Sequence, residues 1–169
     1  MKKIFVTLLV LSSVNINGQN NSLGNRFEKK NNLLFEVGGH GLIYSIGYER
    51  TILNGDRFKT LASISGAYYP EFTNYIEFWL PVSISEVVSF GSHHVQLGVG
   101  YTFINFESRS ITGEYERTLD GFVTPSLYYR FQRPSGKIMF KAGFTPFFER
   151  YQNGFEFYPS GGVGVGYLF

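Results

Sequence analysis

The 169-residue sequence contains no cysteine. Without thiols the protein can form no disulfide, no thiolate nucleophile, no cysteine-ligated metal site and no lipid anchor attached to a cysteine. It also lacks an apolar run of about 20 residues, the length that a membrane-spanning helix needs. Disulfide-stapled, thiol-dependent and helical membrane proteins are therefore excluded.

The chain begins with the layout of a secretory signal peptide. Lys2 and Lys3 give a positive start, an apolar run follows at residues 4–14, and the small Gly18 offers a cleavage site. That run is too short to span a membrane as a helix. The expected organisation is a signal peptide, a short periplasmic N-terminal segment and one folded domain, at residues 1–18, 19–31 and 32–169.

The chain has little net charge once this segment is removed. The whole sequence has 15 Lys plus Arg against 13 Asp plus Glu, so loss of Lys2 and Lys3 leaves 13 against 13. Nucleic-acid binding requires a clustered basic surface, and the balanced composition gives no support for one. We therefore expect no nucleic-acid partner.

What the sequence has in abundance is aromatic residues and glycine, with 18 Phe, 12 Tyr and 20 Gly. From residue 32 onward apolar and polar positions alternate with a period of two, which is typical of strands with one apolar face. Val95, Leu97 and Val99, for example, alternate with polar or small residues. The pattern predicts eight strands, at about residues 32–40, 42–52, 58–69, 76–85, 94–103, 123–132, 138–145 and 156–169.

The connections between these strands fall into two sets. Short turns are expected at residues 54–56, 90–92 and 133–137. Longer loops are expected at residues 70–74, 105–121 and 148–155, and the very short first link at 39–41 is the exception in this second set. Short turns at one rim and longer loops at the other are typical of barrels that span a membrane. We therefore predict an all-β fold, an eight-stranded antiparallel transmembrane β-barrel with an up-and-down meander.

The polar face of the predicted strands carries charged side chains among many glycines. A narrow eight-stranded lumen has room mainly for small side chains interleaved with a few large ones. Because charges of both signs are present, we expect them to pair across a plugged lumen, and an open small-solute pore is the alternative. The expected lumen polar network consists of Glu36, Glu49, Glu77, Arg130 and Lys141.

The C-terminal strand carries the most specific pattern. Val163, Val165, Tyr167 and the terminal Phe169 alternate with glycine and Leu168. This ending resembles that of the small outer-membrane barrel superfamily of the OmpA/OmpX type. The resemblance implies that these four residues form the assembly signal read by the barrel-assembly machinery. It further implies a protein of the outer membrane, surrounded by its lipids, and we expect a monomer.

Residues for catalysis or metal binding are scarce. His93 and His94 would point to opposite faces of a strand, and His40 stands alone between glycines. The only aspartates, Asp56 and Asp120, fall in expected turns or loops, and no His-x-Ser pair like that of the lipid A deacylase barrels occurs. We therefore expect no enzyme, cofactor or metal site, with a barrel enzyme acting on outer-membrane lipid as an alternative.

The loop expected between the fifth and sixth strands is the most highly charged. It is either a solvated loop or a contact surface for a partner, and loops on rigid scaffolds often carry binding. The protein would then serve envelope structure or surface-loop interaction. The candidate interaction loop contains Glu107, Arg109, Glu114, Glu116 and Arg117.

Overall fold

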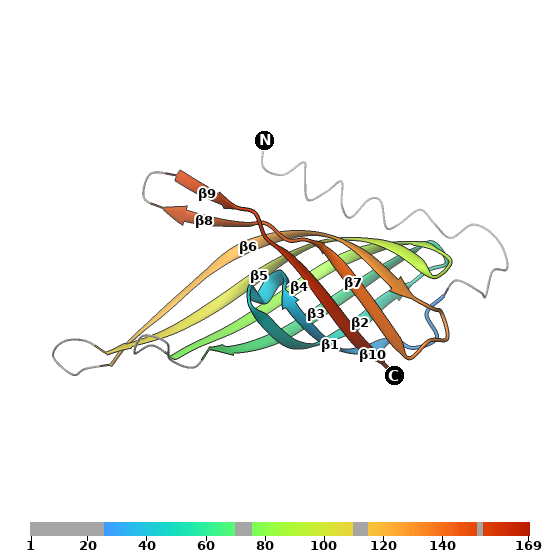
Figure 1. Ribbon diagram of the computed structural model, residues 1–169, viewed down its shortest axis with the longest axis horizontal. Coiled ribbons are helices and arrows are strands. Elements are labelled where there is room, and N and C mark those ends of the chain that lie inside the picture. The colour runs from blue at the N-terminus through green and yellow to red at the C-terminus, as the bar shows by residue number, and fades with distance from the viewer. Residues whose placement is uncertain (1–25, 70–75, 110–114, 152–153) are drawn as a thin grey trace.

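The structure, a computed structural model, describes residues 26–69, 76–109, 115–151 and 154–169 (Figure 1). The predicted signal peptide, and the predicted segment 19–31 up to residue 25, lie outside these described residues. No helix in the described ranges is long and apolar enough to cross a membrane.

The described chain forms ten β-strands and a single turn of 3-10 helix. Their bounds are β1 Asn31–Gly38, η1 Gly39–Gly41, β2 Tyr44–Asn54, β3 Phe58–Tyr69, β4 Ile76–Phe90, β5 His93–Arg109, β6 Tyr115–Gln132, β7 Ile138–Phe144, β8 Phe147–Tyr151, β9 Gly154–Tyr158 and β10 Gly161–Leu168.

Eight of these strands close into a barrel. Strands β1 to β6 each pair with the next strand in the chain, β7 pairs with β10, and β10 pairs with β1. Every pairing is antiparallel. The prediction of an eight-stranded antiparallel barrel with a meander topology is confirmed.

The barrel has two unlike ends. The turn end carries the β2–β3, β4–β5 and β6–β7 turns together with the C-terminus, where Phe169 N–H donates to the Asn31 carbonyl at 2.9 Å. At the opposite end, the loop end, strands β4 to β6 extend far beyond the rest of the wall (Figure 1). The short wall opposite consists of β1, β7 and β10, which have seven or eight residues each.

The two faces of the wall are sorted as the alternation predicts. In β5 the side chains of Val95, Leu97 and Val99 are exposed, whereas those of His94 and Gln96 are buried inside the barrel. The same sorting holds along β10, where Val163, Val165 and Tyr167 point outward in the register with β1 and β7. An exposed apolar wall around a polar interior suits lipid as the surrounding solvent.

The seventh and eighth predicted strands belong to one long hairpin with an interruption. Phe144 pairs with Gly161 and Phe147 pairs with Tyr158, so the register continues unchanged from β7–β10 into β8–β9. Between them, Pro146 and Pro159 stand opposite each other, and neither has a backbone N–H to donate to the ladder. The predicted strand at 156–169 is therefore broken, and the loop predicted at 148–155 is mostly the β8–β9 hairpin, which projects from the barrel (Figure 1).

The loop predicted between the fifth and sixth strands is also largely strand. Strand β5 continues to Arg109 and β6 begins at Tyr115, with Glu107 paired to Arg117 across the two backbones. Beyond the apolar band both faces of a hairpin can meet water, so the sequence there no longer alternates and the strand is hidden from pattern analysis.

Candidate functional site

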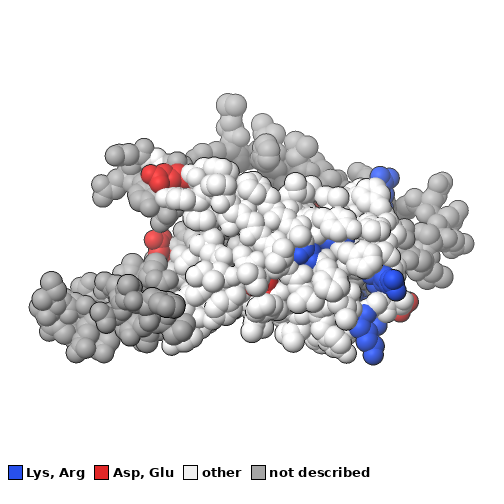
Figure 2. Space-filling view, in the orientation of Figure 1, with Lys and Arg blue, Asp and Glu red and all other residues white. Residues whose placement is uncertain are grey.

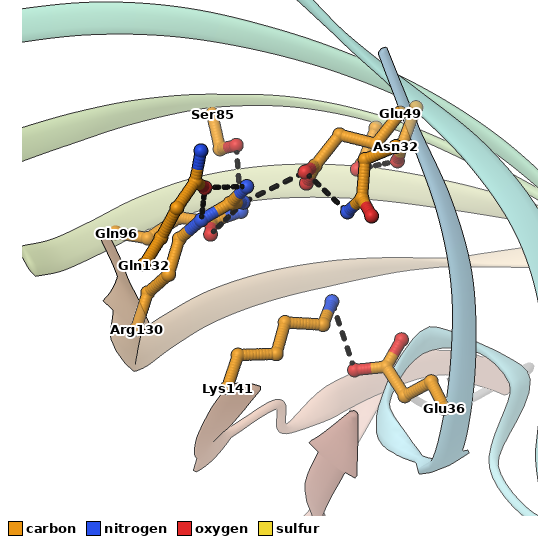
Figure 3. Close-up of polar contacts among 10 residues, drawn as sticks. Asn32, Glu36, Glu49, Ser85, Gln96, Arg130, Gln132 and Lys141 are labelled. Atoms are coloured by element: carbon orange, nitrogen blue, oxygen red, sulfur yellow. Dashed lines mark hydrogen bonds and ion pairs between the residues drawn. The ribbon is translucent and has the colours of Figure 1, made fainter. Parts of the chain in front are cut away.

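The centre of the barrel holds a buried ion pair (Figure 3). The guanidinium of Arg130 donates from Nη1 to Glu49 Oε1 at 2.7 Å, and both side chains are almost fully buried. Arg130 also donates from Nη2 to Gln132 Oε1 at 2.6 Å and from Nη1 to Gln96 Oε1 at 3.2 Å. Asn32 Nδ2 donates to the same Glu49 oxygen at 3.1 Å. The desolvated charges are therefore matched by one another and by neutral amides, as buried charges require.

A second ion pair lies beside the first. Lys141 Nζ is 3.1 Å from Glu36 Oε1, the Tyr128 hydroxyl donates to the same oxygen, and the ammonium stands 4.3 Å from the centre of the Tyr128 ring. Gly164 gives the lysine its space, because a Cβ there would lie 3.0 Å from Lys141 Cε. Small and large inward side chains thus interleave across the lumen.

The side chain of Phe27 closes the lumen at the turn end, and we call this residue the stopper. Its ring is buried against Leu61 and Val87. Lys59 Nζ lies 4.8 Å from the ring centre and the guanidinium carbon of Arg130 lies 5.6 Å from it. Leu61, which breaks the polar pattern of β3, points inward because it packs against this ring. The stopper therefore has an apolar seat inside an otherwise polar lumen.

Backbone contacts hold the stopper in place. Phe27 N–H donates to Asn54 Oδ1 at 3.1 Å, and Asn54 Nδ2 donates back to the Phe27 carbonyl at 2.8 Å. Glu28 N–H donates to the Pro134 carbonyl at 3.1 Å. Residues 26–30 therefore belong structurally to the barrel mouth, just before the start of β1.

The loop end of the lumen is occupied by η1. The first predicted strand stops at Gly38, which has a φ of +75° and is followed by a residue with a φ of +66°, so the backbone turns inward where glycine is permitted. All three residues of Gly39–Gly41 are buried, and Thr102 Oγ1 of β5 donates to the His40 carbonyl at 2.9 Å. A Cβ at Gly100 would lie 2.6 Å from His40 Cδ2. The short first link is thus a plug, which explains why it is no external loop.

A row of aromatic side chains runs around the loop end. Neighbouring ring centres are between 4.9 and 5.8 Å apart, in edge-to-face, tilted or stacked contact. The Tyr69 hydroxyl donates to the Gly41 carbonyl, so the row adjoins η1. Its members, from β2 to β9, are Tyr44, Tyr69, Trp79, Phe122, Phe147 and Tyr158.

The sequence-based site residues separate into three groups. Of the expected lumen network, Glu36, Glu49, Arg130 and Lys141 meet inside the barrel, while the side chain of Glu77 lies outside the described part of the structure. In the candidate interaction loop, Glu107, Arg109, Glu116 and Arg117 lie on β5 or β6, and Glu114 falls outside the described ranges. The expected assembly signal, Val163, Val165, Tyr167 and Phe169, is exposed on the outer face of the barrel.

Several lumen residues were missed by sequence analysis. Gln96, Gln132 and Tyr128 fall on the polar face of predicted strands, and only their partners were unknown. Phe27 is harder to predict as a lumen residue, because it lies in a polar segment without periodicity. The one signal that points to Phe27 is that it is the only aromatic residue of the segment 19–31.

A histidine–serine contact exists, but it is enclosed. His94 Nδ1 is 2.9 Å from Ser89 Oγ, and its Nε2 is 2.9 Å from the Gln132 carbonyl. Ser89 Oγ also accepts from Lys59 at 2.7 Å, and Phe27 covers the imidazole edge-on at 5.2 Å. The described residues include no cluster of three or more His, Asp or Glu suited to a metal ion. This geometry gives a substrate no access to the pair.

Comparison with known proteins supports the fold. No protein-family model and no curated protein matches the sequence. Among solved structures, the chain is similar to the N-terminal β-barrel domain of OprF from Pseudomonas aeruginosa, with 12% identity, a TM-score of 0.51, and coverage of 86% of this chain and 98% of that one. Ail of Yersinia pestis, crystallised with the heparin analogue sucrose octasulfate, aligns with 13% identity and a TM-score of 0.47, over 83% of this chain and 94% of that one.

The similarity to the OprF barrel supports the class of fold. The chain has the closed eight-stranded fold of outer-membrane β-barrels and resembles the OprF barrel over 86% of its length.

Proposed function

We propose that this protein is a non-enzymatic integral barrel of the bacterial outer membrane, with a plugged lumen, exported by its N-terminal signal peptide. Its work would lie in envelope structure or in interactions at the loop end. The apolar outer wall supports the membrane location, because outward residues such as Leu97 and Val99 would be costly to expose to water.

The observation that carries the proposal is a lumen filled along its length. Phe27 occupies the turn end, η1 occupies the loop end, and two ion pairs lie between them. An eight-stranded barrel is only wide enough for its own side chains. Passage of an ion would require the stopper, a buried ion pair and η1 all to move. We therefore favour a closed barrel over a small-solute pore.

Planar-bilayer recording tests this function. Purified, folded protein should give no stable conductance steps, because Phe27, the ion pairs and η1 would block the passage of ions. The matched variant combines Phe27→Ala, Glu49→Ala and Arg130→Ala with replacement of Gly39–Gly41 by Asn-Gly. It removes the stopper, both charges of one pair and η1, and it should leak ions measurably. Steady ohmic current through the unmodified protein would contradict the proposal and favour a pore.

Interaction at the loop end is supported by the shape of the barrel. The β5–β6 extension and the β8–β9 hairpin both project beyond the short wall and diverge from each other (Figure 1). The exposed Phe148 and Phe157 face each other on the hairpin, with ring centres 5.5 Å apart. Charged and aromatic groups held on a rigid scaffold are suited to binding a partner outside the cell.

A further inference from the structure

Basic side chains gather at the turn end of the barrel, where Figure 2 shows the blue groups near the C-terminal side of the molecule. All are exposed, and they come from the residue before β1, from β2, and from the turns before β3 and β7. In the strand order they lie along the arc that runs from β6 through β7, β10, β1 and β2 to β3. We call this set the basic rim, and it consists of Lys30, Arg50, Arg57, Arg133 and Lys137.

The basic rim borders the apolar outer wall directly. The guanidinium carbon of Arg57 lies 5.9 Å from the ring centres of both Phe58 and Phe90, which are themselves exposed. Lys137 immediately precedes the exposed Ile138, the first residue of β7. Long basic side chains at such a border lay their methylene groups on apolar surface and hold the charge in the headgroup region.

Acidic groups at this end are fewer than the basic ones. Asp56 is paired with Arg26, with Nε and Oδ1 2.7 Å apart. The half-buried Glu86 accepts a hydrogen bond at 2.5 Å from the Thr60 hydroxyl, a neutral donor that does not offset a carboxylate's charge, and Glu28 is exposed. Among the described side chains, the five cations of the basic rim outnumber these two carboxylates. At the loop end the exposed charged side chains that the structure describes are acidic, Asp120 and Glu156. Among the exposed side chains that the structure describes, charge is therefore polarised along the barrel axis.

We infer that the basic rim binds the phosphate groups of anionic phospholipids in the leaflet around the turn end. Cations at the edge of an apolar band attract anionic headgroups, at about 1 kcal/mol per Lys or Arg near the surface, which corresponds to about five-fold in binding. The inference rests on the proposed membrane location, and short-turn ends of such barrels face the periplasm. The occupant would thus be a phospholipid of the inner leaflet.

Native mass spectrometry of the folded protein in neutral detergent tests this binding site. Equal amounts of phosphatidylglycerol and phosphatidylcholine with the same acyl chains are added, and the bound lipids are counted. The unmodified protein should retain phosphatidylglycerol preferentially. In the variant R50Q/R57Q/R133Q/K137Q the preference should fall at least about five-fold, the factor expected for one interfacial cation.

The matched control keeps charge and changes shape. The variant R50K/R57K/R133K/K137R should bind phosphatidylglycerol like the unmodified protein, and circular dichroism should show all variants folded. Equal binding of the two lipids by the unmodified protein would overturn the inference, as would an unchanged preference in the neutralised variant. Bilayer recording addresses the closed lumen separately, so failure of lipid binding and failure of the proposed function give different results.

Discussion

Glu49 and Arg130 come from strands on different sides of the barrel, and their encounter explains what sequence analysis can and cannot predict. The period of two places both side chains in the lumen, and their opposite signs predict that they pair with something. Which partner each one finds depends on strand tilt and register around the closed barrel. The sequence does not specify that register. The structure is therefore needed to show that Arg130 pairs with Glu49 and Lys141 with Glu36.

Removal of Glu49 tests the energetic role of this pair. Glu49→Ala should lower the free energy of unfolding by about 3–5 kcal/mol, because it leaves Arg130 charged and buried beside neutral amides. The double variant Glu49→Ala with Arg130→Met removes both charges and should recover much of that loss. Urea titration in detergent micelles measures both values, and an unchanged midpoint for the single variant would show that the lumen is more hydrated than the structure indicates.

Among the elements, the long hairpin formed by β7 and β8 with β9 and β10 shows why a hydrophobic pattern alone does not predict where a strand is interrupted. Residues 161–169 alternate clearly, and the sequence predicts one strand that starts at about residue 156. Pro159 alone would be tolerated at a strand edge, but it stands opposite Pro146. Two facing prolines interrupt the ladder, and their opposition cannot be known before the register of the hairpin is fixed.

The two loop-end connections β5–β6 and η1 should respond differently to shortening. Replacing residues 106–118 by Asn-Gly joins the paired Asn105 and Leu119 through a two-residue turn, and the barrel should stay folded while any interaction of this extension is lost. Replacing Gly39–Gly41 by Asn-Gly should instead destabilise the barrel, because η1 fills its mouth. Thermal unfolding followed by circular dichroism compares the two, and equal stability would contradict the role of η1 as a plug.

At the scale of the whole molecule, the apolar wall predicts that the cost in stability of an outward-facing charge depends strongly on its depth in the bilayer. Val99→Arg places a charge midway along β5 and should lower the free energy of unfolding by roughly 2–4 kcal/mol. Ile138→Arg at the rim should lower it by about 0–1 kcal/mol. Both positions point outward, so only their depth differs. Reversible unfolding from lipid vesicles measures the two losses, and similar values would mean that the wall does not face a bilayer.

The terminal aromatic tests biogenesis separately from stability. Phe169→Ala should reduce outer-membrane levels in cells while changing in vitro stability little, since the side chain is exposed and the backbone bonds to Asn31 remain. Ile138→Ala serves as the control, because it truncates a similarly exposed side chain without touching the expected assembly signal. Quantitative immunoblots of membrane fractions measure the levels, and normal amounts of the Phe169 variant would remove the support for that signal.

The seam between β1 and β10 has a consequence for the order of events during folding. It pairs Asn32 with Leu168 and Val37 with Val163. Strand β1 therefore cannot complete its pairing until β10 has been synthesised. Until then both edges of the sheet carry unpaired backbone groups, which hydrocarbon does not tolerate. Such distant pairing is also slow, because a long chain must be closed first. Entry into the membrane and completion of the ring should therefore occur as one cooperative step, with no long-lived half-inserted form.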